Sequence, residues 1–175
     1  MNIACIGGGP AGLYFGLLMK KQDPRREVVV VERNRPYDTF GWGVVFSDET
    51  LDNLSANDPE SAAAIRSHFA YWDDIAVHFR GSVHRVGGNG FCGCSRRKLL
   101  LILQERAHEL GVHLQFQTDI DDEARFADAD LIILADGINS RFREKYVAHF
   151  QPEVDVRSNY FAWMEIGRAS CRERV

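Results

Sequence analysis

Three glycines near the amino terminus stand at spacings that suit the binding of a phosphate group. Gly7, Gly9 and Gly12 form a Gly-x-Gly-x-x-Gly pattern. The first glycine permits a tight turn, the second lets a backbone approach a pyrophosphate, and the third lets a helix pack closely on a strand. The amino end of that helix would offer free N–H groups and a positive dipole end. The pattern predicts a dinucleotide-binding turn made by Gly7, Gly8, Gly9, Pro10, Ala11 and Gly12.

The segments on both sides of this turn fit the same prediction. A short apolar strand at 2–6 precedes the turn, and a second strand at 27–32 ends in Glu32, about twenty residues after Gly12. A carboxylate at that place accepts a hydrogen bond from a ribose 2′-hydroxyl and repels a 2′-phosphate. This argues for FAD or NAD, and against NADP, in this particular site. The alternative is a doubly wound domain whose glycines serve packing only.

Length and charge exclude several classes of protein. The chain has 175 residues and a formal net charge of −4, so nothing in its charge favours nucleic acid or an anionic membrane as a partner. No apolar run reaches the length of a membrane span, and the first strand begins too early for a signal peptide. The cysteines suggest reduced thiols in a cytoplasmic protein, and neither they nor the scattered histidines predict a metal site. The cysteines are Cys5, Cys92, Cys94 and Cys171.

The remaining periodicity gives a coarse order of elements. Strands are expected at 2–6, 27–32, 112–117 and 130–135. Helices are expected at 11–21, 48–54, 58–70 and 96–110, the last capped by Ser95 and ended by Gly111. Loops are expected at 33–46 and around Cys92-Gly93-Cys94, and a short acidic hairpin or loop is expected at 119–126. Alternating strands and helices predict an α/β fold with a parallel sheet.

A β-hairpin at 75–86 does not fit that sheet. Its alternating strands at 75–80 and 83–86 are joined by Gly81-Ser82, and such a hairpin cannot belong to a parallel βαβ sheet. We expect it to begin a second, antiparallel sheet, to which a strand at 158–164 also belongs.

A second motif follows the strand at 130–135. The run Ala-Asp-Gly-x-x-Ser-x-Phe-Arg at 135–143, with Asp136-Gly137 at its start, resembles the Asp-Gly motif of single-component flavoprotein monooxygenases. A third match is Arg96-x-x-Leu99-x-x-x-Leu103. Taken alone, Arg96-Arg97-Lys98 would be a solvated basic turn. Together with the glycine turn, and in the same order, the three motifs mark the resemblance.

The resemblance implies roles for particular residues. In that family the aspartate at Asp136-Gly137 lies near the FAD pyrophosphate and the approach of the nicotinamide. Arg96 would contact the phosphate or ribitol of the flavin. Glu32 and Arg33 fall where the family contacts the adenosine half, as does Ile120 through its backbone.

Two further stretches narrow the resemblance to the aryl-CoA hydroxylase branch. Residues 31–36 and 40–51 are similar to that branch, as are 72–75 and 90–93, and the similarity covers residues 1–164. Relatives that act on free hydroxybenzoates carry arginines where this chain has Gly41-Trp42-Gly43. A tryptophan-oxidising branch of pigment biosynthesis also has a Gly-Trp-Gly loop. From the residues alone, this loop could lie against a ligand or plug a core.

The branch implies a Rossmann-like FAD/NAD(P)-binding domain over 1–164, with strands of a substrate sheet near 75–86 and 158–164. It implies FAD as cofactor, NADH or NADPH as co-substrate, O2, and hydroxylation of an aromatic CoA thioester such as salicylyl-CoA or 2-aminobenzoyl-CoA. The chain would be an amino-terminal fragment, inactive alone, with a reductase domain possible downstream. Because the flavin carries the difficult step, no acid–base residue is named.

Basic residues near the motifs leave one question open. The phosphates of a CoA ester could bind to Arg80, Arg85, Arg97 or Lys98. The alternative is that each of these side chains is an ordinary solvated surface residue.

Other functions remain open. The first is another flavoprotein oxidoreductase, for instance a dehydrogenase or a halogenase. The second is an NAD-only dehydrogenase, against which Asp136-Gly137 and the hairpin argue. The third is a module that senses FAD or NAD without turnover.

The last residues stand apart. Residues 165–175 match no secondary-structure pattern and resemble the translation of a common sequencing adapter. We expect the biological sequence to end near Met164. A genuine polar tail is the alternative.

Overall fold

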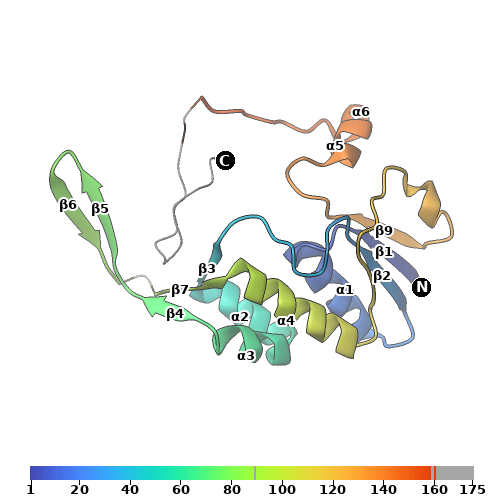
Figure 1. Ribbon diagram of the computed structural model, residues 1–175, viewed down its shortest axis with the longest axis horizontal. Coiled ribbons are helices and arrows are strands. Elements are labelled where there is room, and N and C mark those ends of the chain that lie inside the picture. Colours follow the sequence, from blue (N-terminus) through green and yellow to red (C-terminus); the bar gives the residue numbers. More distant parts are fainter. Residues whose placement is uncertain (89, 159, 161–175) are drawn as a thin grey trace. The chain divides into compact units, whose positions relative to one another are not determined.

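The computed structural model describes residues 1–88, 90–158 and 160 (Figure 1). The chain divides into two compact units, Met1–Arg141 and Phe142–Val175. The strand expected at 158–164 lies almost entirely outside the described residues, and 165–175 lies wholly outside them. The boundaries expected for the FAD-binding domain and for the foreign tail therefore stay predictions.

A four-stranded parallel sheet forms the centre of the first unit. Its strands, in spatial order, are β8 (His113–Gln115), β2 (Glu27–Val31), β1 (Asn2–Ile6) and β9 (Leu131–Leu134). Val31 and Leu134 both stand in register with Ile6, so the neighbouring strands β2, β1 and β9 end level with one another. The strand order reverses beside β1, and ligands bind outside the carboxyl ends at such a point. The predicted Rossmann-like parallel sheet is confirmed.

Two helices cover one face of this sheet. The helix α1 (Pro10–Gln22) follows β1 through the glycine turn, and α4 (Arg96–Glu109) precedes β8. Ser95 caps α4 by accepting a hydrogen bond from the Lys98 N–H, and Gly111 ends it with φ +85°. Both were predicted. A residue with a Cβ would be strained at that φ, which explains why the helix ends in glycine.

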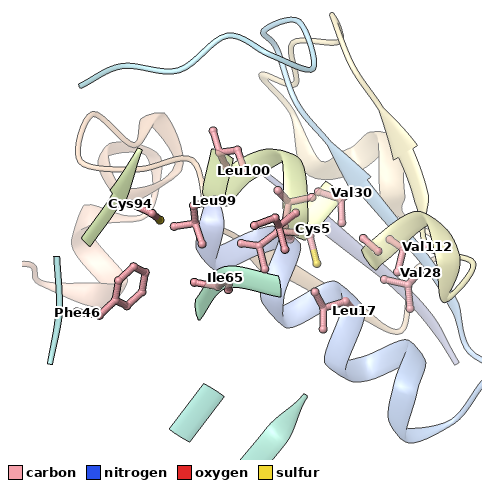
Figure 2. Close-up of a cluster of buried hydrophobic side chains, with 14 of the residues drawn as sticks. Cys5, Leu17, Val28, Val30, Phe46, Ile65, Cys94, Leu99, Leu100 and Val112 are labelled. Atoms are coloured by element: carbon pink, nitrogen blue, oxygen red, sulfur yellow. The ribbon is translucent and has the colours of Figure 1, made fainter. Parts of the chain in front are cut away.

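The core runs from the parallel sheet through these helices to a second sheet (Figure 2). Cys5 and Val30 come from the parallel sheet, and Leu17 and Leu99 come from the helices. Phe46 belongs to the second sheet. Leu17 is fully buried, and burying one such side chain contributes about 1.5–3 kcal/mol. The parallel sheet and the sheet that contains Phe46 therefore share one hydrophobic core.

The second sheet is antiparallel and corrects the sequence prediction. Its order is β3 (Gly43–Ser47), β7 (Phe91–Ser95) and β4 (Ala70–Trp72). The loops predicted over 43–46 and at Cys92-Gly93-Cys94 are therefore wrong. Glycine weakens a strand signal, but Gly93 fits where a side chain would not, since a Cβ there would lie 3.2 Å from the Trp72 ring. Pairing on both sides of β7 then satisfies its backbone.

Two short helices connect β3 to β4 within the antiparallel sheet. The helix α2 (Asp48–Asn57) begins at the Ser47 cap, and α3 (Pro59–Arg66) begins at the Asp58 cap. Figure 1 shows α2, α3 and α4 side by side. We predicted that the second of these helices extends to residue 70. It ends at Arg66 instead, because Ala70 already pairs with β7.

The predicted hairpin is confirmed as β5 (Ile75–Phe79) and β6 (Ser82–Val86). All ten residues of its two strands are exposed. A two-stranded hairpin is marginally stable alone. Between β8 and β9, the acidic segment forms the single turn η1 (Glu123–Phe126). The sequence missed two short helices, α5 (Arg141–Lys145) and α6 (Val147–Phe150).

Candidate functional site

The first and second motifs meet at the carboxyl edge of the parallel sheet. The Ala135 N–H donates to the Ile6 carbonyl at 2.8 Å, and the Gly7 N–H donates to the Val31 carbonyl at 2.8 Å. Gly7 has φ +115°, and a Cβ there would lie 2.2 Å from the Ala135 carbonyl oxygen. Glycine is therefore required at this position by both conformation and packing. The glycine turn and the start of the Asp136-Gly137 motif lie in direct contact.

Packing does not explain the middle glycine of the turn. A Cβ on Gly12 would lie 2.0 Å from the Gly7 carbonyl oxygen, so Gly12 is needed for close packing. A Cβ on Gly9 would meet nothing within 4 Å. Gly9 is also the N-cap of α1, and no side chain caps that helix. Pro10 has no N–H and the Leu13 N–H donates to the Gly9 carbonyl, so the N–H groups of Ala11 and Gly12 are the ones that no side chain caps, as a diphosphate cradle requires.

Glu32 closes the other side of the turn. Its Oε2 accepts a hydrogen bond from the Gly8 N–H at 2.8 Å. Its Oε1 accepts from the Asn34 N–H at 2.8 Å and from the Asn34 side-chain amide at 2.7 Å. A carboxylate has about four acceptor positions, so these three donors leave one for a hydroxyl. Asn34 fixes the orientation of this carboxylate, and the sequence interpretation missed it. Its place two residues after an acid was the available signal.

Asp136 and Ile120 are linked through Arg141, which the sequence did not single out. The Asp136 Oδ2 accepts a hydrogen bond from the Arg141 N–H at 3.1 Å, and the Ile120 carbonyl accepts from the Arg141 guanidinium at 3.2 Å. The same guanidinium forms an ion pair with Asp119. Gly137 follows with φ +88° in an exposed turn. The residues predicted after β8 and β9 are thereby brought into one network.

Two predicted residues lie apart from that network. Arg33 is exposed, and its side chain has no hydrogen bond or ion pair with the described residues. Arg96 begins α4, where its N–H donates to the Trp42 carbonyl at 3.0 Å. Trp42 and Phe40 are 46% and 75% exposed, so the loop plugs no core within the described part of the chain. Arg96 is thus held against the Gly41-Trp42-Gly43 loop.

The candidate site is an open edge of the sheet. A hollow of about 310 Å³ lies near the amino ends of β1 and β2, between Asn2, Glu27 and Phe126. A second hollow of about 480 Å³ lies between Tyr37 and the outer face of α4. Neither hollow is lined by the glycine turn, Glu32 or Asp136.

A buried charge cluster lies away from this edge. Asp58 is fully buried beneath α1, α3 and α4, with Lys21 at 2.7 Å and Arg106 at 3.0 Å. Burial would raise the pKa of Asp58, but hydrogen bonds from Arg106, Lys21 and Ser61 hold it well below its usual value. The buried Cys5 thiol has its pKa raised to about 12, so it is not a nucleophile.

Metal binding and membrane insertion find no support in the described residues. Their His, Cys, Asp and Glu side chains form no cluster able to hold a metal ion. None of the helices within 1–88, 90–158 and 160 combines the length and the apolar character that crossing a bilayer requires.

Comparison with curated proteins gives several relatives. The chain is 50% identical over 163 residues to salicyloyl-CoA 5-hydroxylase of Streptomyces sp, covering 93% of this chain and 32% of that protein. It is 30% identical to 3-hydroxy-4-methyl-anthranilyl-[aryl-carrier protein] 5-monooxygenase of Streptosporangium sibiricum, covering 97% and 47%. It is also 30% identical to protodeoxyviolaceinate monooxygenase of Chromobacterium violaceum, covering 93% and 44%. The chain thus spans less than half of these relatives.

Solved structures agree on the fold. A tetrameric form of 2-methyl-3-hydroxypyridine-5-carboxylic acid oxygenase matches with a TM-score of 0.67 at 20% identity, covering 80% of this chain and 40% of that one. CtdE in complex with FAD and a substrate matches with a TM-score of 0.67 at 18% identity, covering 83% and 40%. No family model matches the chain. The chain is a homologue of FAD-dependent aromatic monooxygenases, and it corresponds to about a third of salicyloyl-CoA 5-hydroxylase.

Proposed function

We propose that the chain is the FAD-binding part of a monooxygenase that hydroxylates an aromatic CoA thioester with NADH or NADPH and O2. The 50% identity to salicyloyl-CoA 5-hydroxylase supports both the reaction and the substrate class. Since the chain covers 32% of that relative, the activity belongs to a longer polypeptide. The amino-terminal position within that polypeptide is part of the proposal.

The observation that carries the proposal is the open cradle at Gly9. Gly7 and Gly12 are explained by packing, but Gly9 leaves space that no described residue fills. The uncapped amino end of α1 would hold the FAD diphosphate there. Glu32 would accept a hydrogen bond from the adenosine ribose. Asp136 and Gly137 would border the diphosphate from the β9 side.

Arg96, Arg33 and Ile120 would complete the site. Arg96 would contact the phosphate or ribitol of the flavin, since α4 has basic but no acidic residues in its first turn. Basic groups there oppose the helix dipole, and a bound anion would offset that cost. Arg33 and the Ile120 backbone would border the adenosine.

FAD, when bound, would supply the redox chemistry with NAD(P)H and O2. The residues of this chain would bind and orient it. The turn supplies backbone N–H groups for the diphosphate, and Asn34 keeps the Glu32 carboxylate facing the turn. No residue of this chain is assigned as an acid or base.

The proposal also includes contacts between basic residues of this chain and the phosphates of the CoA ester. Arg80 and Arg85 lie on the exposed hairpin, and Arg97 and Lys98 lie in the first turn of α4. Any of them could meet CoA phosphates, and removing all four charges would then weaken affinity for a CoA ester. Unchanged affinity would leave them as solvated surface. A downstream reductase domain and a cytoplasmic location stay predictions.

The test uses the full-length product of the gene. NADH and NADPH oxidation would be followed with salicylyl-CoA, 2-aminobenzoyl-CoA and tryptophan, with hydroxylated product identified by mass. We expect a yellow protein whose NAD(P)H oxidation is stimulated by one of the CoA esters. A folded protein that binds FAD but responds to neither ester would contradict the substrate class.

Pigment biosynthesis is the second candidate. The Gly41-Trp42-Gly43 loop and the 30% identity to protodeoxyviolaceinate monooxygenase favour it. Stimulation by tryptophan or an indole derivative, with no response to either CoA ester, would select it over the first candidate.

A further inference from the structure

One arginine joins the two loops that follow β8 and β9, the outermost strands of the parallel sheet. The Arg141 guanidinium pairs with Asp119 and donates to the Ile120 carbonyl at 3.2 Å. Its backbone N–H donates to the Asp136 carboxylate at 3.1 Å. Asp119 and Ile120 follow β8, whereas Asp136 follows β9. Arg141 therefore holds both loops through three separate hydrogen bonds.

The sheet order makes this link long-range. β8 and β9 are the two edge strands, with β2 and β1 between them. Neighbouring strands lie about 4.8 Å apart, so the two edges are separated by roughly 14 Å. The loop after β8 crosses part of that distance beside β2, where the Thr118 N–H donates to the Glu32 carbonyl at 3.0 Å. Arg141 spans what remains.

These bonds complete a closed ring of segments around the carboxyl edge. The glycine turn is bonded to Glu32 through Gly8, and Glu32 is bonded to Thr118. The segment at 118–120 is joined through Arg141 to Asp136, which lies against Gly7. Every link except the Arg141 link joins strands or loops that are neighbours in the sheet.

We propose that Arg141 is a positioning residue that closes this ring and so fixes the separation of the two loops bordering the nucleotide. The inference rests on the proposed function, because the nucleotide in question is FAD. Arg141 reaches the loops and needs no contact with the cofactor. Ordering two loops in advance removes part of the entropy that binding would otherwise cost.

The link should affect binding more than folding. The Arg141 and Asp119 side chains are 48% and 56% exposed, and exposed ion pairs contribute little to global stability. The side-chain part of the link is what Arg141→Gln removes, since the backbone N–H bond to Asp136 remains.

The experiment uses the full-length gene product, first freed of cofactor. FAD dissociation constants would be measured for wild type, Arg141→Gln, Arg141→Lys, Asp119→Asn and the double variant Arg141→Gln/Asp119→Asn. Arg25→Gln is the matched control, because Arg25 forms an ion pair with Asp23 near the amino end of β2, away from the carboxyl ends of the strands. Hydrogen exchange at 118–120 and 136–140 would be recorded on the same cofactor-free proteins.

We expect Arg141→Gln and Asp119→Asn each to raise the dissociation constant about three- to tenfold, which corresponds to about 0.6–1.4 kcal/mol. The double variant should match either single variant, Arg141→Lys should be intermediate, and Arg25→Gln should equal wild type. Exchange should rise in both loops of Arg141→Gln, with little change in the melting temperature.

Other outcomes separate the possible failures. Wild-type affinity in Arg141→Gln, or additive losses in the double variant, would overturn the proposal and leave the proposed function standing. Raised exchange in only one loop would overturn it as well. A wild-type protein that binds no FAD would instead remove the proposed function, whatever the exchange data show.

Discussion

Two kinds of carboxylate site occur in this chain, a buried one at Asp58 and an open one at Glu32 and Asp136. Asp58 is fully buried, with Lys21 and Arg106 as cationic partners. Glu32 and Asp136 are half-buried at the carboxyl edge of the sheet, where backbone N–H groups of Gly8 and Arg141 donate to them. Asp58 joins α1, α3 and α4, whereas Glu32 and Asp136 stay partly open to solvent.

The comparison shows that a perturbed carboxylate need not mark a functional site. Hydrogen bonds lower the pKa of Asp58 although burial opposes that shift. Asp58 is nevertheless closed off from solvent, and its acceptor positions are filled by Lys21, Ser61 and Arg106. Perturbation points to function only together with accessible geometry. The edge carboxylates have that geometry.

The largest effect is expected from Asp58→Ala. This change removes the buried carboxylate that Lys21 and Arg106 share, leaving them only the exposed Glu60 and Glu109, and it removes the cap of α3. We therefore expect a loss of about 2–4 kcal/mol of unfolding free energy. Urea denaturation of the full-length protein would measure it. FAD affinity of the molecules that remain folded should not change. A loss below 1 kcal/mol would contradict the role assigned to the cluster.

The next largest effect is expected from acid, which should remove the stability that Asp58 contributes. Because the pKa of Asp58 is lowered from its ordinary value of 3.8, its contribution is fully present above about pH 4. Stability should fall as the pH drops below 3.8 towards the folded-state pKa. Unfolding free energies at pH 7, 4 and 3 would show this. Asp58→Asn should flatten the decline, and an equally steep decline in that variant would place the acid sensitivity elsewhere.

Two glycine substitutions test the edge itself. Gly9→Ala meets no protein atom within 4 Å, so stability should change by less than about 0.5 kcal/mol while FAD affinity falls at least about tenfold. Gly7→Ala is the matched comparison. Its Cβ would lie 2.2 Å from the Ala135 carbonyl oxygen, so it should destabilise the fold by about 1–3 kcal/mol.

Calorimetric titration and denaturation of both variants would measure these effects. If Gly9→Ala bound FAD like wild type, the open cradle would have no role.

The smallest effect is expected from Glu32→Gln. The amide oxygen can still accept a hydrogen bond, but the charge is lost, so FAD affinity should fall about three- to tenfold. NADP-type ligands should be repelled less, which competition with a 2′-phosphorylated nucleotide would detect. Asn34→Ala should act in the same direction, because Asn34 orients this carboxylate. Unchanged FAD affinity in both variants would contradict the assigned role.

The sequence predicted the parallel sheet and its edge well, because their signals are local. A run of valines marks β2, and the glycine turn marks the start of α1. The antiparallel pairing of 43–47 with 91–95 was missed, since it depends on segments far apart in the chain. Cys92-Gly93-Cys94 carries little strand signal of its own, and its neighbours β3 and β4 supply the pairing.

The site was predicted in the same uneven way. Gly7, Glu32 and Asp136 were expected to border the same nucleotide, and the structure brings them to one edge of the sheet, where β2, β1 and β9 end together. Arg141 and Asp119 were missed, because their pairing follows from how two loops cross the sheet. Nothing in their spacing indicates it. The roles of Arg33, Arg96 and Ile120 in binding stay predictions.

Binding of FAD to the purified full-length gene product tests the central claim most directly. Equilibrium titration of the cofactor-free protein should give one FAD per chain, with affinity lost on Gly9→Ala and retained on Arg25→Gln. A folded protein that binds no FAD, or binds it equally well with Gly9→Ala, would contradict the claim that this edge holds the flavin nucleotide.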